Sequence, residues 1–188
     1  MSSCKRPVIA GNSGANGLTL IELMITLLIC SLALTIALPS FQQLLERERL
    51  IAAAETLAGQ LQLAKLEALK NNRNVRLSFS VLNNETWCYG LSYSACNCWQ
   101  ANSCQLNGRQ FVISHAEFPG ISLTGTTTPW SNGAVFEPRR GFVTAGGATL
   151  SSAHFQIRVK TSNQGRIRIC NDHSLQTKTD LGRYPSCN

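Results

Sequence analysis

An apolar segment near the N-terminus constrains this chain more than any other part of its sequence. From Leu18 to Leu38 there are 21 residues with a single charged side chain, Glu22. At about 1.5 Å per residue, a helix of this length crosses the roughly 30 Å hydrocarbon core of a bilayer. The segment therefore predicts a membrane-spanning helix over residues 18–38.

The residue before this segment distinguishes it from a secretory signal peptide. In a signal peptide the small-residue cleavage site follows the apolar run, whereas here Gly17 precedes it. A cut between Gly17 and Leu18 removes only a leader of residues 1–17 and leaves the helix on the mature chain. Glu22 is also unusual, because a carboxylate in a membrane helix usually marks function. The alternative is an ordinary signal anchor that tolerates a glutamate near its cytoplasmic end.

These residues resemble the class III prepilin signal of type IV pilins and type II secretion pseudopilins. Gly17 precedes Leu-Thr-Leu-Ile-Glu, and Pro39 ends the apolar run; only Leu18 departs from the common pattern, which most often has Phe. The resemblance implies cleavage after Gly17 and N-methylation of Leu18 by a prepilin peptidase. It also implies that Glu22 pairs with the N-terminal amine of a neighbouring subunit in a filament, which gives a buried carboxylate its partner.

Charge and cysteine content suggest where the rest of the chain resides. Lys5 and Arg6 precede the apolar run, so the positive-inside rule keeps the leader cytoplasmic and sends the C-terminal part across the membrane. Six cysteines follow the apolar run, an even number that is typical of an oxidising compartment. We expect a single-pass protein of a bacterial inner membrane, with a periplasmic C-terminal domain that later reaches the pilus or cell surface.

The six cysteines are expected to form disulfides. Cys170 and Cys187 would close an 18-residue loop, which stabilises by about 3 kcal/mol on the chain-entropy argument. The other four would pair among themselves in one of three ways: Cys88, Cys96, Cys98 and Cys104. A zinc site is the competing interpretation, but their spacing matches no common zinc finger. We expect neither a metal site nor a cofactor.

Periodicity predicts one long helix followed by strands. Residues 39–71 continue the helix as an amphipathic segment, with a stripe at spacings of three and four that comprises Leu50, Ala54, Leu57, Leu61, Ala64 and Ala68. Alternation and apolar runs predict strands at residues 75–81, 87–93, 110–114, 133–136, 141–144, 154–160 and 165–170. Residues 119–133 resemble an exposed loop. The expected fold is α+β, the type IV pilin fold, with a long N-terminal helix packed on an antiparallel β-sheet domain over residues 72–188.

The second half of the chain resembles the FimT/GspH branch of the minor pilins. The resemblance lies in three short motifs: Trp87-Cys88-Tyr89-Gly90, Phe136-Glu137-Pro138-Arg139-Arg140-Gly141 and Gly165-Arg166-Ile167-Arg168. Within that branch the chain is most similar to the FimT minor pilins of naturally competent bacteria. There, a Gly-Arg-x-Arg motif near the C-terminus is associated with DNA binding.

Basic residues concentrate toward the C-terminus and suggest an anionic partner. Residues 138–188 carry eight basic and two acidic side chains, whereas residues 18–137 carry seven and eight. A strand places Arg166 and Arg168 on one face, about 6.6–7 Å apart, and arginine can bind phosphate bidentately. The alternative is a charged strand that only discourages edge pairing. The predicted DNA-binding residues, several in a basic tail over residues 165–188, are Gly165, Arg166, Arg168, Lys160, Arg158, Lys178 and Arg183.

The expected function is that of a minor pilin that binds extracellular duplex DNA through its phosphates and supports uptake in natural transformation. The alternative is a structural minor pilin or a GspH-like pseudopilin of type II secretion, which primes or caps a filament without binding DNA. We expect no enzyme, because His115, His154 and His173 are scattered and no Gly-x-Ser-x-Gly motif occurs. Trp130 and Tyr184 are the candidates for base stacking, and for Trp130 packing in the core or on the surface is the favoured alternative. Besides DNA, the expected partners are other pilins, the prepilin peptidase and the inner membrane.

Overall fold

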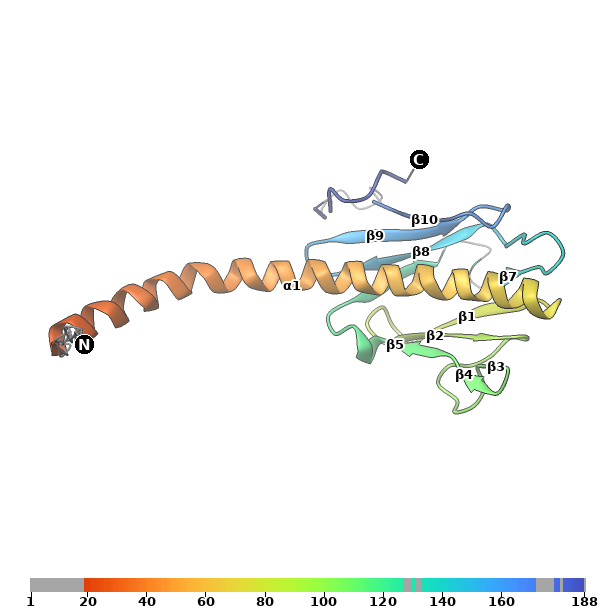
Figure 1. The fold of residues 1–188 in the computed structure, drawn as a ribbon, viewed down its shortest axis with the longest axis horizontal. Coiled ribbons are helices and arrows are strands. Elements are labelled where there is room, and N and C mark those ends of the chain that lie inside the picture. Colours follow the sequence, from red (N-terminus) through yellow and green to blue (C-terminus); the bar gives the residue numbers. More distant parts are fainter. Residues whose placement is uncertain (1–18, 127–129, 131–132, 172–177, 180, 188) are drawn as a thin grey trace, which may run out of the picture. The chain divides into compact units, whose positions relative to one another are not determined.

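One long helix and ten short strands make up the described chain (Figure 1). The computed structural model describes residues 19–126, 130, 133–171, 178–179 and 181–187. Its elements are α1 (Leu20–Asn71), β1 (Val75–Val81), β2 (Trp87–Ser92), β3 (Gln105–Leu106), β4 (Arg109–Gln110), β5 (Val112–Ser114), the 3-10 turn η1 (His115–Glu117), β6 (Ser122–Thr126), β7 (Ala134–Phe136), β8 (Gly146–Ser151), β9 (Gln156–Thr161) and β10 (Ile167–Cys170). The chain divides into two compact units, residues 1–40 and 41–188.

The described part of the first unit is the N-terminal half of α1. The Thr19 hydroxyl accepts a hydrogen bond from the Glu22 amide at 3.3 Å, which caps the helix, and helical geometry continues through Pro39. Apolar side chains of this half are exposed, as at Leu20, and the helix is long and apolar enough to cross a membrane. Cys30 is a free, exposed thiol. Gly17 and Leu18, the predicted cleavage site, lie outside the described residues.

The second unit contains the whole described core. Its helical part buries the predicted stripe, in which Leu50, Leu57 and Leu61 are fully inaccessible to solvent. The helix ends at Asn71, and Asn72 adopts a positive φ of 49°, a common way to stop a helix. All buried residues of the main core lie between Leu50 and Leu181. We therefore expect residues 41–188 to fold without the preceding segment.

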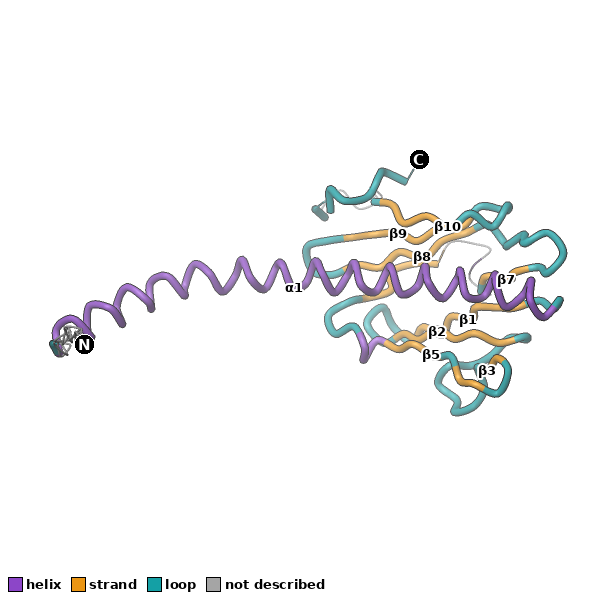
Figure 2. Tube along the Cα trace, viewed as in Figure 1, coloured by secondary structure: helices purple, strands orange, loops and turns teal. Residues whose placement is uncertain are grey.

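The strands form two four-stranded antiparallel sheets rather than one (Figure 2). The first sheet has the order β5-β2-β1-β7 and the second β10-β9-β8-β6, while β3 and β4 pair as a separate hairpin. Both sheets and α1 contribute to one apolar core. The predicted α+β class with a long N-terminal helix and antiparallel strands is confirmed.

The described part of residues 119–133 is not the exposed loop that the sequence predicted. It contains β6, and Ile121, Leu123 and Trp130 in it are buried. The indole Nε1 of Trp130 donates to the Thr144 carbonyl at 2.9 Å. A Cβ on Gly146 would lie 2.3 Å from the Trp130 ring, so glycine at this position makes room for the indole. The sequence did not predict β8, because the two glycines at its start resemble a loop. The strand expected at residues 141–144 is reduced to one bridge between Phe136 and Val143.

Three disulfides lie in the second unit. Cys170–Cys187 is present as predicted, and the four clustered cysteines pair as Cys88–Cys98 and Cys96–Cys104. These two bonds fold residues 94–104 over one face of β2, so that all six residues of β2 are buried. Gly90 is required there, because a Cβ would lie 2.6 Å from the Cys104 side chain.

Candidate nucleic-acid interface

The hairpin formed by β9 and β10 carries the predicted phosphate-binding arginines. The two strands pair antiparallel from Thr161–Ile167 to Arg158–Cys170. Between them, the Gly165 amide donates to the Ser162 carbonyl at 2.9 Å and the Arg166 amide donates to the Ser162 hydroxyl at 3.3 Å. Gly165 has a φ of +73°, which glycine adopts without strain. These hydrogen bonds therefore fix the backbone at Arg166, where the chain passes from the turn into β10.

Side chains of the hairpin alternate between core and solvent. Arg166 and Arg168 are exposed, whereas Ile167 and Ile169 are partly buried against the core. Lys160 lies directly opposite Arg168 across the ladder, and Arg158 lies opposite Cys170. Cross-strand partners have Cβ atoms about 4.5–5.5 Å apart on the same face of a sheet. We call Arg158, Lys160, Arg166 and Arg168 the basic face.

The basic face borders a shallow hollow of about 390 Å³ at the end of the hairpin. Its lining comprises Lys160, Thr161, Ser162, Gln164, Arg166 and Arg168. On the next strand, Gly147 lies opposite Lys160, and a Cβ added there would come within 3.2 Å of the Arg158 Nε atom. Glycine at this position thus leaves room for the Arg158 side chain to lie over β8. Sequence reasoning missed Gly147, because nothing local to it signals that its neighbours on β9 are basic.

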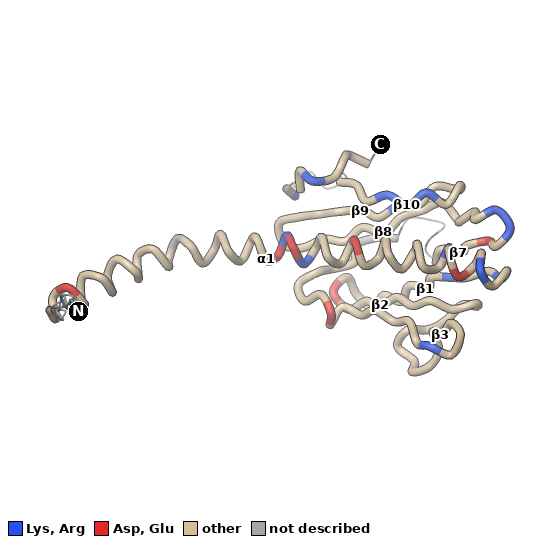
Figure 3. The backbone as a smooth tube through the Cα atoms, viewed as in Figure 1, with Lys and Arg blue, Asp and Glu red and all other residues tan. Residues whose placement is uncertain are grey.

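Charge is arranged to attract an anion at this side of the domain. Figure 3 shows Lys and Arg along β10 and in the loop after β7, and Asp and Glu mostly on α1 and at the other side of the domain. Glu137, which directly follows β7 and is exposed, is the exception among the described residues. Arg168 and Lys160 lie opposite each other across the ladder, so two cationic side chains stand side by side at this end of the hairpin.

The C-terminal tail carries its basic side chains away from the basic face. Lys178 donates to the carbonyl of Ser152, which lies before the start of β9, and Arg183 pairs with Glu55 of α1 at 3.7 Å. Within the basic face, Lys160, Arg166 and Arg168 lie toward the other end of β9, which at about 3.3 Å per residue is roughly 20 Å long, whereas Arg158 is the third residue of that strand. The structure thus brings together four of the six basic side chains predicted to bind DNA and leaves Lys178 and Arg183 elsewhere.

Neither aromatic candidate for base stacking lies free beside the basic face. Trp130 is fully buried. The Tyr184 hydroxyl donates to Glu55 at 2.9 Å, which fixes the ring against α1. Partial burial and this hydrogen bond to a carboxylate raise the pKa of Tyr184 above its ordinary value. Of these two rings, neither is therefore available to stack on a base beside the basic face.

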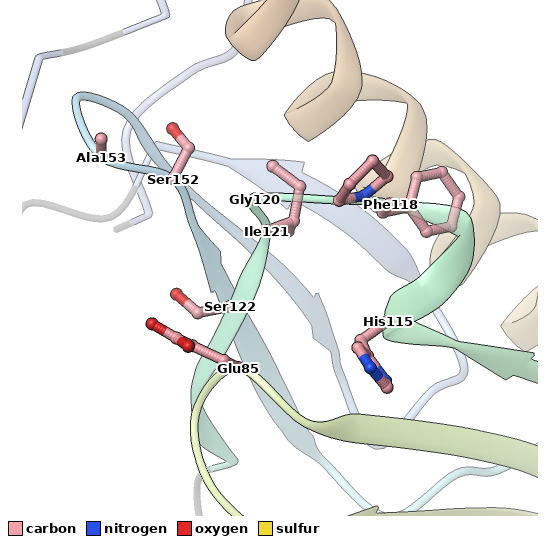
Figure 4. Close-up of a pocket in the computed structure, with 9 residues that line it drawn as sticks. Glu85, His115, Phe118, Gly120, Ile121, Ser122, Ser152 and Ala153 are labelled. Atoms are coloured by element: carbon pink, nitrogen blue, oxygen red, sulfur yellow. The ribbon is translucent and has the colours of Figure 1, made fainter.

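A larger hollow, of about 550 Å³, shares no lining residue with the hollow beside the basic face (Figure 4). Its lining includes Glu85, His115 and Ser122 but no Lys or Arg. The Ser122 hydroxyl donates to the Ser151 carbonyl at 3.0 Å, and the His115 ring instead faces Trp99 at 6.2 Å between centroids. Figure 4 shows His115 apart from Ser122 and Glu85. Among these described residues, the three side chains do not form the hydrogen-bonded nucleophile and base that hydrolysis needs.

Sequence comparison matches two family profiles. The profile described as type II transport protein GspH covers residues 53–173, and the prokaryotic N-terminal methylation motif covers residues 12–38. No curated protein sequence matches the chain.

Comparison with solved structures finds the type IV minor pilin FimU of Pseudomonas aeruginosa in two crystal forms. In space group P65 it has a TM-score of 0.44 and 16% identity, covering 73% of this chain and 98% of FimU. In space group P21 the TM-score is 0.46 and the identity 19%, covering 76% of this chain and 98% of FimU.

Proposed function

This chain belongs to the family of type II transport protein GspH and carries the prokaryotic N-terminal methylation motif, and we propose that it is a minor pilin that binds duplex DNA through the basic face. The observation that carries the proposal is the alignment of the exposed Arg166 and Arg168 on one face of β10, with the half-buried Lys160 opposite Arg168 on β9. Arginines two residues apart on a strand suit successive phosphates, and guanidinium groups bind phosphate through paired hydrogen bonds.

Membrane anchoring and filament assembly fit the exposed apolar half of α1 and the methylation motif. In the proposed assembly pathway, a prepilin peptidase cleaves after Gly17 and methylates Leu18. Before assembly the protein resides in the inner membrane with its domain in the periplasm. Glu22 then pairs with the amine of a neighbouring pilin as the helix enters the filament. The domain has a binding role and no catalytic one.

Binding is expected to be weak and indifferent to sequence. Phosphate contacts position a protein on DNA without identifying bases. If each of the four side chains of the basic face contacts one phosphate, together they contribute a slope of log K against log[salt] near −3.6 for duplex DNA. Several copies along a pilus would bind more tightly by avidity, since each further contact is intramolecular. Such a pilus supports DNA uptake in natural transformation.

The proposal is tested by titrating residues 41–188 with duplexes of unrelated sequence at several salt concentrations. The Arg166→Ala/Arg168→Ala variant should lower the affinity and make the slope shallower by about 1.8, the share of two phosphates. The matched control is Arg49→Ala/Arg109→Ala, which removes two exposed basic residues outside the basic face. An unchanged affinity in the first variant, or equal losses in both, contradicts the proposal.

The second candidate function is that of a pseudopilin in type II secretion, which the description of the matching family favours. Such a protein primes or caps a filament without binding DNA. This alternative is established if the purified domain binds no duplex at low salt and deletion of the gene abolishes type II secretion. It fails if deletion leaves secretion unchanged.

A further inference from the structure

A second pair of arginines lies on the turn between β7 and β8. Arg139 and Arg140 are both exposed there, and the turn is closed by the Glu137 amide, which donates to the Phe142 carbonyl at 2.8 Å. The Arg140 guanidinium lies 5.8 Å from the centre of the Phe142 ring. We call Arg139 and Arg140 the arginine arm.

Two glycines bring this turn against the hairpin of the basic face. Gly165 and Gly141 are both buried and have φ angles of +73° and +61°. A Cβ added to Gly165 would lie 2.3 Å from the Gly141 carbonyl oxygen and 3.1 Å from the Lys65 Nζ atom. No side chain fits between these backbones, so the glycine of the Gly-Arg-x-Arg motif serves close contact as well as turn formation.

Further hydrogen bonds fix the two loops to each other. The Lys65 ammonium of α1 donates to the Gly165 carbonyl at 3.1 Å. Asn163 accepts from two amides of the β7–β8 loop, Val143 through its carbonyl and Ala145 through its side chain, both at 3.2 Å. The Thr161 hydroxyl donates to the Thr144 carbonyl at 3.1 Å. The arginine arm is therefore held in one position relative to the basic face.

The contact sets an upper limit on the distance between the two groups of arginines. Arg140 precedes Gly141 and Arg166 follows Gly165 directly. With standard bond lengths, the Cα atoms of Arg140 and Arg166 are no more than about 14 Å apart. A DNA strand bound to Arg166 and Arg168 thus passes within reach of the arm's long side chains.

We propose that the arginine arm binds further phosphates of the same DNA molecule, and that the contact between Gly165 and Gly141 positions it for this. The inference rests on the proposed function and extends its site around the end of the hairpin. DNA then follows a track from Arg158 and Lys160 through Arg168 and Arg166 to the arm. Lys65 is a positioning residue in this track, because its ammonium group holds the Gly165 carbonyl.

The first test removes the arm and leaves the basic face intact. Arg139→Ala/Arg140→Ala in residues 41–188 should make the salt slope shallower by about 1.8, as two lost phosphate contacts require. Arg49→Ala/Arg109→Ala is again the control with the same loss of charge. Suppose that Arg139→Ala/Arg140→Ala has the same salt slope as the parent domain, whereas Arg166→Ala/Arg168→Ala has a shallower one. This inference then fails and the proposed function stands. If the parent domain binds no duplex, both fail.

The second test moves the arm without changing any charge. Gly165→Ala should reduce the salt slope by a similar amount, because the added methyl group separates the two loops. Gly108→Ala is the matched control: its φ of +76° imposes the same backbone strain, but no atom lies within 4 Å of the added Cβ. Thermal unfolding of both variants measures the purely structural effect. A lower melting temperature with an unchanged slope in Gly165→Ala overturns the positioning role.

Discussion

The two sheets of the domain contribute to the same core but differ in what covers their other face. In the first sheet, β2 is buried along its whole length, because a segment cross-linked by Cys88–Cys98 and Cys96–Cys104 lies over it. In the second sheet, β10 presents Arg166 and Arg168 to solvent. The comparison teaches that the first sheet serves stability, whereas the second has a surface available to a partner.

A substitution in the first sheet should destabilise the core that both sheets share. Trp87 on β2 is fully buried, and its Nε1 donates to the carbonyl of Ile121, the residue before β6 of the second sheet. Trp87→Ala should lower the free energy of unfolding by about 3–5 kcal/mol. Trp99→Ala, at a side chain that is 41% exposed, is the control and should cost much less. Urea unfolding followed by circular dichroism measures both, and a small loss at Trp87 contradicts a common core.

The second sheet is cross-linked at the end of its edge strand β10 by Cys170–Cys187. We expect this bond to stabilise β10 more than the first sheet. Cys170→Ser/Cys187→Ser frees the tail from the end of β10 and should lower the free energy of unfolding by about 3 kcal/mol, as expected for a loop of this size. Hydrogen exchange should increase at β10 more than at β2. An equal increase in hydrogen exchange in both sheets would show that the Cys170–Cys187 bond stabilises the whole domain.

The cover of the first sheet depends on a glycine. Gly90→Ala places a methyl group 2.6 Å from the Cys104 Sγ and Cβ atoms, and overpacking of this kind costs about 1–3 kcal/mol. Gly59→Ala, in α1 with no atom within 4 Å of the added Cβ, should instead stabilise by about 0.5–1 kcal/mol. Thermal unfolding compares the two, and thiol alkylation shows whether Cys96–Cys104 still forms. A stable, fully oxidised Gly90→Ala domain would contradict the tight cover.

A contact between Glu46 of α1 and His154, in the turn before β9, should make the stability of the domain depend on pH. We call this contact the clasp. Glu46 accepts from the His154 amide and contacts the His154 ring nitrogen, both at 2.8 Å. Partial burial alone raises the pKa of Glu46, but hydrogen bonds from Ser152 and His154 outweigh it and hold that pKa below the ordinary value.

Because the folded-state pKa of Glu46 is lowered, its stabilisation is present above the pKa of the unfolded chain and is lost as pH falls through the folded-state value. The difference in unfolding free energy between the parent domain and Glu46→Gln should be about 1 kcal/mol or less near neutral pH and should vanish in acid. Urea titrations at pH 7 and pH 3 measure it. A difference that grows in acid would contradict the clasp.

Local pattern was sufficient to predict much of the candidate site. Arg166 and Arg168 were placed correctly on one solvent-facing side because a strand has a period of two, and Ile167 and Ile169 had to face the core. The pairing of Arg183 with Glu55 on α1 was not predicted, because nothing in the sequence near Arg183 indicates it.

The sequence by itself determined the apolar helix, the amphipathic stripe that follows it and the Cys170–Cys187 bond, since each depends on periodicity or spacing within one stretch of chain. Only the tertiary structure decided that the strands form two sheets, that Trp130 is buried, and that Gly141 and Gly165 bring two loops together. These features come from contacts between residues far apart in sequence, and such contacts are set by packing of the whole core rather than by any local preference.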